Sequence, residues 1–190
     1  MCAAPSQSLP PFTDDGLLPP GDYRLTLDEL SDSILVCGPA GATNWDESWR
    51  LQLVKNLAEL HGQLRSVGID RVFIDGSFTE EKDHPNDIDG YFECDQEELF
   101  SGRLQQQLNL LDEYKCWTWE RDSRRPYPGY PKLQLPMWHQ YRVELYPHYG
   151  QFSGLTDEYG NEMEFPSAFR QSRDGRPRGI VQIVEGESTA

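Results

Sequence analysis

Two apolar segments separated by a polar loop, between residues 71 and 94, constrain the fold most strongly. The first, RVFIDG, is rich in β-branched and aromatic residues and predicts a strand that ends at Gly76-Ser77. The second, DIDGYFEC, predicts another strand, which carries Asp87 and Asp89. Side chains two positions apart on a strand point to the same face, so these carboxylates are expected side by side. Like charges that close need a counterion.

Further elements are expected on either side of these strands. Leucines at spacings of four, three and four predict an amphipathic helix from about Trp45 to Val67, with Asn44 as its N-cap. A second helix is expected from Gln96 to about Leu111. The other expected elements are a short helix or turn at 25–30, a short strand or buried segment at 33–38, a surface loop at 123–136, a strand at 141–149, a turn at 157–161, a helical piece at 165–171 and a last strand at 179–185.

The domain organisation follows from length and from the distribution of proline. A chain of 190 residues suits one well-buried domain and is short for two. Residues 1–22 are rich in proline and glycine and are expected to form an extended arm. Residues 23–190 are then a single domain.

The composition is strongly acidic, with 32 Asp and Glu against 17 Lys and Arg and a formal net charge of -15. This charge works against sequence-independent binding to nucleic acid or to an anionic membrane, so a phosphate-bearing partner needs a local site. Two basic stretches are candidates, although solvated loops explain either one alone; they contain Arg121, Arg124, Arg125 and Lys132, and Arg170, Arg173, Arg176 and Arg178. With no signal-peptide pattern, no membrane-spanning run and no CxxC pair, a cytoplasmic location is expected.

A third acidic residue, Glu144, lies on the later predicted strand YRVELYPHY. The order of elements puts Asp87, Asp89 and Glu144 on neighbouring strands of one small sheet. Three carboxylates brought together raise each other's proton affinity unless a divalent cation neutralises them. Oxygen ligands of this kind suit Mg²⁺ or Mn²⁺ rather than zinc, so these residues are candidate metal ligands.

The Gly76-Ser77 step predicts a phosphate site beside these acids. A glycine lets the backbone approach a phosphate closely, and the Ser77 hydroxyl and nearby N–H groups can donate hydrogen bonds to it. In phosphoryl transfer the protein mostly positions an in-line attack, while metal ions bridge the nucleotide phosphates. Phosphate donors next to metal ligands imply a nucleoside triphosphate.

The same residues resemble the signature of the DNA polymerase beta-like nucleotidyltransferase superfamily. That signature is a GS or GG turn, a DxD-type pair and a third acid on a later strand, which match Gly76-Ser77, Asp87-Ile88-Asp89 and Val143-Glu144-Leu145. The motif covers about half of the chain, and the strings LPPGDYRLTLDEL, GSFTEEKDHPNDID and RGIVQIVE extend a similarity to small, stand-alone bacterial members. The resemblance implies an α+β minimal nucleotidyltransferase fold, with a small mixed sheet and helices packed mainly on one face.

The activity implied by the resemblance is Mg²⁺-dependent (or Mn²⁺-dependent) transfer of a nucleoside monophosphate from an NTP such as ATP to a protein, tRNA or small-molecule acceptor, with release of pyrophosphate. Asp87 and Asp89 would bind both metal ions, and Glu144 would hold the ion that activates the acceptor hydroxyl. Candidate nucleotide-binding residues are Gly76, Ser77, Lys82, Arg124 and Arg125. Such stand-alone members resemble components of toxin-antitoxin or phage-defence systems.

Two other functions stay open. The same fold can act as a non-catalytic nucleotide- or partner-binding module, such as an antitoxin or a regulator. A metal-dependent nuclease also uses clustered carboxylates, but it gives the Gly-Ser turn no role. Gly90 departs from the superfamily pattern, where a bulky apolar residue is usual, and is expected to loosen the strand or to leave room for substrate. An aromatic-rich region at 117–141 would either stack on a base or pack into the core.

Overall fold

The computed structural model describes residues 9–157, 159–172 and 174–186. Its strands are β1 (Asp22–Leu25), β2 (Val72–Asp75), β3 (Ile88–Glu93), β4 (Val143–His148), β5 (Phe152–Thr156), β6 (Glu162–Glu164) and β7 (Ile180–Ile183). Its α-helices are α1 (Leu27–Ser31), α2 (Ile34–Cys37), α3 (Glu47–Ser66), α4 (Gln96–Phe100), α5 (Arg103–Leu111), α6 (Pro136–Tyr141) and α7 (Phe165–Phe169). Two 3₁₀-helices, η1 (Gly76–Thr79) and η2 (Arg121–Ser123), complete the described elements.

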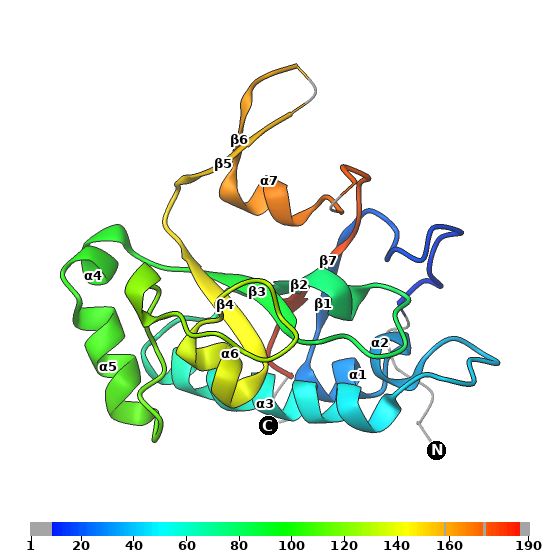
Figure 1. Cartoon of the computed structure of the whole chain (residues 1–190), viewed down its shortest axis with the longest axis horizontal. Helices are drawn as coiled ribbons and strands as arrows, with labels where there is room; N and C mark the ends of the chain where they lie inside the picture. Colours follow the sequence, from blue (N-terminus) through cyan, green and yellow to red (C-terminus); the bar gives the residue numbers. More distant parts are fainter. Residues whose placement is uncertain (1–8, 158, 173, 187–190) are drawn as a thin grey trace.

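Five of the strands form one mixed sheet in the order β1-β7-β2-β3-β4. Strand β2 is antiparallel to both of its neighbours, whereas the outer pairs β1–β7 and β3–β4 are parallel. Helices α1, α3 and α6 lie on one side of this sheet, and α7 lies with the β5–β6 hairpin on the other side (Figure 1). The predicted combination of a mixed sheet with helices is confirmed.

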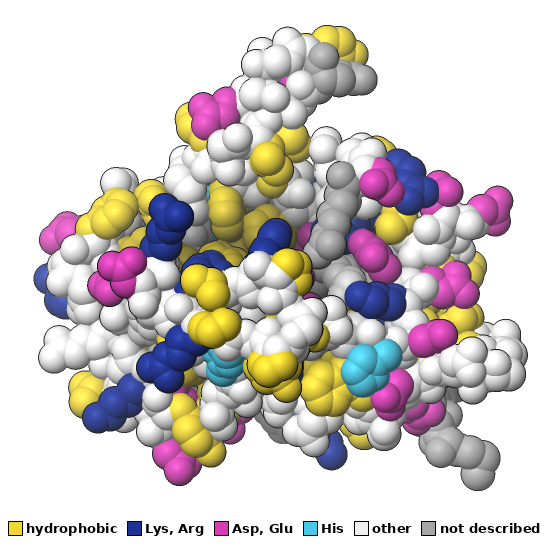
Figure 2. Space-filling model, in the orientation of Figure 1, with side chains coloured by type: hydrophobic (Ala, Val, Ile, Leu, Met, Phe, Trp, Pro, Cys, Tyr) yellow, Lys and Arg dark blue, Asp and Glu magenta, His cyan; other side chains and the backbone are white. Residues whose placement is uncertain are grey.

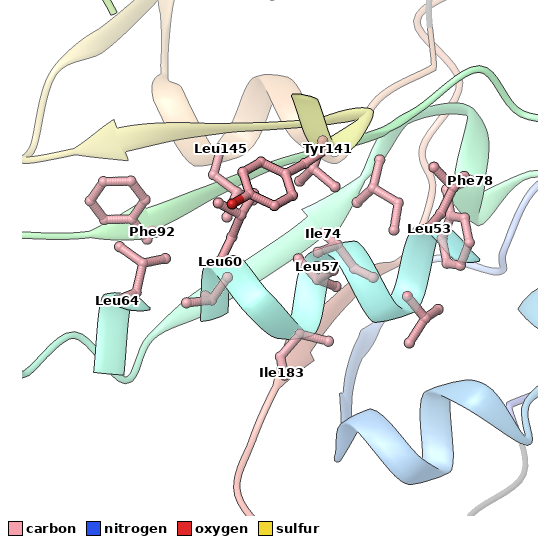
Figure 3. Close-up of a cluster of buried hydrophobic side chains, with 14 of the residues drawn as sticks. Leu53, Leu57, Leu60, Leu64, Ile74, Phe78, Phe92, Tyr141, Leu145 and Ile183 are labelled. Carbon is pink, nitrogen blue, oxygen red and sulfur yellow. The ribbon is translucent and has the colours of Figure 1, made fainter. Parts of the chain in front are cut away.

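The main core lies between α3 and the sheet. Leu53, Leu57, Leu60 and Leu64 are all fully buried, and they point at strand residues that include Ile74 and Leu145 (Figure 3). Truncating a buried leucine of this kind to alanine typically costs about 2–5 kcal/mol. The amphipathic helix predicted from the leucine spacing is confirmed, and its apolar stripe fixes which face of each strand points inward.

A smaller apolar cluster covers part of the opposite face of the sheet. Phe73 and Tyr91, paired across β2 and β3, stack with their ring centroids 4.7 Å apart. Phe165 and Phe169 of α7 pack on Tyr91, with centroids at 6.1 and 5.2 Å. Ile180 completes the buried part of this cluster. Helix α7 therefore covers part of the second face.

Several elements differ from the sequence prediction. Residues 33–38, expected as a strand or buried segment, contain the helix α2, which Ser33 caps by accepting a hydrogen bond from the Leu35 N–H. The single helix expected from Gln96 to Leu111 is divided, because Gly102 adopts a left-handed conformation with φ of 77° between α4 and α5. Helix α3 is capped by Asp46, not Asn44: Asp46 accepts from the Trp49 N–H at 3.0 Å.

The described part of the N-terminal arm packs on the domain. Leu17 and Leu18 are buried, and the Leu18 carbonyl accepts a hydrogen bond from the Gly179 N–H at 2.9 Å. The next residues form β1, which the sequence does not predict because only four residues separate a Gly-Pro turn from the cap of α1. Within the described ranges, no helix is both long enough and apolar enough to cross a membrane.

Candidate functional site

An acid row crosses three neighbouring strands of the sheet. Asp75 of β2 is paired with Asp89 of β3, and Asp89 is paired in turn with Glu144 of β4. Residues directly opposite one another in a sheet project from the same face. Asp87 precedes β3 and is electrostatically coupled to Asp89 and Glu144. The three predicted acids are thus brought together, and Asp75 joins them.

The acid row lies on the face of the sheet that α7 partly covers. Asp75 and Asp89 are each two residues from the stacked pair Phe73 and Tyr91, so all four side chains share this face. The row lies where β2 ends and β3 begins, next to the α7 cluster rather than beneath the leucines of α3. On this side of the molecule the surface is hollowed below the β5–β6 hairpin, with Lys and Arg side chains around the hollow (Figure 2).

The crowding of carboxylates changes their protonation. Burial, followed by the charges of Asp87, Glu144 and Asp75, raises the pKa of Asp89 to about 8. Burial also raises the pKa of Asp75 to about 7, against the opposing effect of the Arg178 guanidinium. The pKa of Asp87 is raised as well, first by burial and then by Glu144. A carboxyl group whose pKa is raised to about 7 is typical of functional sites. Such a pKa indicates that the surrounding protein does not fully compensate the negative charge of the carboxylates.

Glu144 is held by hydrogen bonds at both of its carboxylate oxygens. Its Oε1 accepts from the Leu135 N–H at 3.0 Å, and its Oε2 accepts from the Tyr146 hydroxyl. Arg124 donates from Nη2 to the same hydroxyl at 3.0 Å, and its Nη1 lies 3.8 Å from Glu144 Oε1. The predicted nucleotide-binding residue Arg124 is therefore close to the acid row, where it partly balances Glu144.

The aromatic region approaches the site through Trp138. The buried indole N–H of Trp138 donates to Asp87 Oδ2 at 2.6 Å. The guanidinium of Arg142 lies 3.8 Å from the centroid of Trp138 and 4.2 Å from that of Tyr127, so these ring faces already have a cation partner. Trp117 is buried in the main core. Of the two readings of this region, packing and anchoring fit these contacts better than a base-stacking surface.

The turn after β2 forms the 3₁₀-helix η1. Gly76 has φ of 78°, and a Cβ atom placed there would lie 2.4 Å from Oδ2 of Asp89. The glycine thus makes room for the acid row, in addition to the phosphate contact that the sequence predicts. Ser77 is partly exposed beside it, while Thr79 is buried and donates to Asp75 Oδ1 at 3.3 Å. The turn and the row form one unit.

Gly90 has a packing role. It lies on the opposite face of β3 from Asp89, and a Cβ there would meet the Phe73 carbonyl oxygen at 2.3 Å and Leu145 Cδ2 at 3.0 Å. Protein atoms already fill this space. The expectation that Gly90 leaves room for a substrate is therefore wrong, and the glycine instead permits close packing of β3 against its neighbours.

The loop that follows the turn is anchored by Arg50 of α3. The buried guanidinium donates to four carbonyl oxygens, at distances from 2.6 to 3.1 Å; they belong to Leu35, Phe78, Glu80 and Lys82. The side chain of Lys82 is exposed, and its charge acts on Asp87. The sequence predicts a flexible loop here, but Arg50 anchors the backbone at Lys82. The Lys82 side chain is close enough to the acid row for its charge to act on Asp87.

Two predicted arginines have different surroundings from those expected. Arg125 is exposed and lines a pocket of about 580 Å³ together with His139 and Pro136, and the described contacts do not connect its side chain to the acid row. Arg178 belongs to the second basic stretch, and the sequence does not distinguish it from the other arginines there. In the structure it pairs with Asp75 at 2.6 Å. The sequence does not predict Asp75 as a site residue, because its place opposite Asp89 depends on the antiparallel register of β2 with β3.

The donor set suits a hard divalent cation, because the row presents carboxylate oxygens whose mutual repulsion a cation would relieve. The side chains are not arranged as a metal site: in the described part of the chain, no three His, Cys, Asp or Glu residues form a group that could hold a metal ion. Hydrogen bonds from Trp138 and Tyr146 occupy oxygens of Asp87 and Glu144. Carboxylate oxygens are suitable ligands for Mg²⁺. If Asp87 and Glu144 bound the ion through these oxygens, the hydrogen bonds from Trp138 and Tyr146 would be replaced by bonds to the metal.

The fold and the site define an α+β protein with a mixed sheet and a row of interacting carboxylates beside a Gly-Ser turn. The chain belongs to a family of unknown function, DUF6932, whose model matches residues 10–184. Searches of the curated proteins and of the solved structures found no match. The family match spans every strand of the main sheet and all four acids of the row.

Proposed function

We propose that this protein is a metal-dependent nucleotidyltransferase, which transfers a nucleoside monophosphate from an NTP to an acceptor hydroxyl and releases pyrophosphate. The observation that carries the proposal is the register of Asp89 with Glu144 on β4, beside the turn that begins at Gly76. This arrangement supports the resemblance noted in the sequence, since the turn and the acids come from segments almost 70 residues apart in the chain and meet at one end of the sheet.

The residues of the site divide into two groups. Asp87, Asp89 and Glu144 would hold Mg²⁺ or Mn²⁺, which when bound neutralises charge and activates the acceptor hydroxyl. Ser77 and Lys82 would contact the negatively charged triphosphate: Ser77 would donate a hydrogen bond to it, and Lys82 supplies a positive charge beside the acids. Arg124 orients Glu144 through Tyr146. Arg125 is not part of this proposal.

The acceptor is a protein, a tRNA or a small molecule, and a toxin-antitoxin or phage-defence setting belongs to the same proposal. The net charge of -15 favours a protein or a small molecule over a long RNA, because a polyanion would be repelled outside any local basic site. The hollow with basic side chains around it is the surface where an anionic group would be admitted (Figure 2).

The proposal is tested by incubating the purified protein with each α-labelled NTP, Mg²⁺ or Mn²⁺, and fractionated cell extract. We expect a labelled acceptor and stoichiometric pyrophosphate with the wild type, and neither with Asp89→Asn or Glu144→Gln. Asp70→Asn is the matched control, because Asp70 is exposed and lies in the loop before β2, at the end of that strand opposite Asp75. Labelling that persists in Asp89→Asn would reject the assignment.

A non-catalytic nucleotide-binding module is the second candidate. It is supported by the hydrogen bonds that occupy Asp87 and Glu144 and by the absence, among the described residues, of a group of acids placed to hold a metal. Calorimetric titration with NTPs separates the two functions. Binding that is the same in EDTA as in Mg²⁺, without transfer to any fraction of the extract, would favour the module.

A further inference from the structure

Arg178 joins segments that meet at the β2 end of the acid row. From the loop before β7, it donates from Nη2 to Asp75 Oδ2 and from Nη1 to Glu80 Oε1, both at 2.6 Å. Its Nη1 also lies 3.5 Å from the Gly76 carbonyl oxygen, and its Nε lies 3.4 Å from the carbonyl oxygen of Phe169 at the end of α7. One guanidinium thus connects β2, both ends of η1 and α7.

This contact is enclosed, unlike the other ion pairs of the same loop. The side chain of Arg178 is only 10% exposed and that of Asp75 only 1%. Arg176, two residues earlier, pairs with Asp15 and Asp174 through a side chain that is 43% exposed. Exposed pairs are weak, whereas a buried carboxylate that loses its partner is strongly disfavoured, so these two arginines have different roles despite their spacing.

The geometry requires a guanidinium. Separate nitrogens of Arg178 reach two carboxylates that flank the Gly76–Thr79 turn, one before it and one directly after it. A lysine carries its charge at one atom and cannot present two donors in a fixed fork. With both carboxylates held, the ends of the turn are fixed relative to the acid row and to one another.

We propose that Arg178 is a positioning residue, which clamps the Gly76–Thr79 turn through Asp75 and Glu80 in the shape that receives the nucleotide phosphates. The nucleotide part of this inference rests on the proposed function, whereas the clamp itself does not. The same residue also contacts the carbonyl oxygen of Phe169, which links the turn to the end of α7.

The clamp is tested first in the nucleotide-free protein, by amide hydrogen exchange of residues 76–80. We expect exchange to be about tenfold faster in Arg178→Gln, which removes the guanidinium from both ends of the turn, and intermediate in Glu80→Gln, which removes only the charge of one acceptor. Glu80→Gln is the milder variant, since Glu80 is 30% exposed and its loss leaves the pair of Arg178 with Asp75 intact. Arg176→Gln is the matched control and should stay within about twofold of wild type. Unchanged exchange in both Arg178→Gln and Glu80→Gln would overturn the clamp.

The positioning role is tested by titrating each ribonucleoside triphosphate with Mg²⁺, at a temperature where circular dichroism shows every variant folded. Arg178→Gln and Arg178→Lys should both weaken binding about tenfold, while Arg176→Gln should not. A merely structural arginine would lower the melting temperature and leave the affinity of the folded protein unchanged, and that result would overturn the positioning role. A wild type that binds no nucleotide would instead reject the proposed function, with the exchange result still deciding the clamp.

Discussion

The carboxylate of Asp89 lies in the space that a side chain on Gly76 would need. A Cβ at Gly76 would be 2.4 Å from Asp89 Oδ2 and 2.9 Å from its Cβ, closer than such atoms approach in real structures. The turn and the strand therefore depend on each other: the turn has its shape only with a glycine, and the acid has its place only beside that glycine.

Gly76→Ala should be destabilising and inactivating. The left-handed φ of 78° and the collision with Asp89 together are expected to lower the free energy of unfolding by about 1–3 kcal/mol. Urea denaturation measures this change. Gly62→Ala in α3 is the control: it meets nothing within 4 Å and should stabilise the helix by up to about 1 kcal/mol. Equal effects of the two substitutions would contradict the dependence of the turn on Gly76.

Asp89→Asn should make the metal-free protein more stable while it removes activity. Asparagine has nearly the same shape but no charge, so the repulsion of residue 89 by Asp75, Asp87 and Glu144 is removed. At about pH 8, in EDTA, we expect the free energy of unfolding to rise on the order of 1–2 kcal/mol. Mg²⁺ should raise the melting temperature of the wild type and have little effect on the variant. A destabilised Asp89→Asn protein would mean that the carboxylate is not under repulsive strain.

The stability of the metal-free protein should fall as the pH rises through the range set by the acid row. The folded pKa values of Asp89, about 8, and of Asp75, about 7, lie above the ordinary value for an aspartate. The native state then binds more protons than the unfolded state between the ordinary and the folded pKa, so the free energy of unfolding decreases with pH across that range. Subtracting the profile of Asp89→Asn from that of the wild type removes groups with other trends, such as His61. We expect the difference to grow from about pH 5 to pH 8, and a flat difference would contradict the raised pKa of Asp89.

The parts of the fold that the sequence predicts are those with a strong local pattern. The leucine spacing of α3, the β-branched and aromatic residues of β3 and the alternating sequence of β4 each predict an element that the structure contains. The two-residue period of a strand also predicts a shared face for Asp87 and Asp89. Helix α2 and strand β1 were missed because each has only four residues and owes its conformation to a cap or to a partner strand distant in the chain.

The candidate site could be predicted only in part for the same reason. Glu144 could be predicted because its strand has a clear sequence pattern. Asp75 could not, because its place beside Asp89 depends on the register of β2 with β3, which is set by tertiary pairing. The choice between Arg176 and Arg178 depends on burial, since both lie in the same loop with the same chemistry. Sequence spacing contains no information about which of two neighbouring arginines points at a carboxylate 103 residues away.

Arg50→Gln should be among the most destabilising single substitutions in the chain. The guanidinium is fully buried, and four backbone carbonyls accept its hydrogen bonds: those of Leu35, Phe78, Glu80 and Lys82. Glutamine is shorter and offers only two N–H donors, so at least two of these carbonyl oxygens would lose the hydrogen bond from residue 50, at about 1–3 kcal/mol for each buried oxygen left without another donor. Burial lowers the pKa of Arg50 to about 9, which shows the cost of placing this charge inside. Lys55→Gln, an exposed change on the same helix, should stay within about 0.5 kcal/mol of wild type. Urea denaturation and amide exchange of residues 78–82 measure both variants. If Arg50→Gln unfolds at the wild-type urea concentration, the loop beside the acid row does not depend on this anchor.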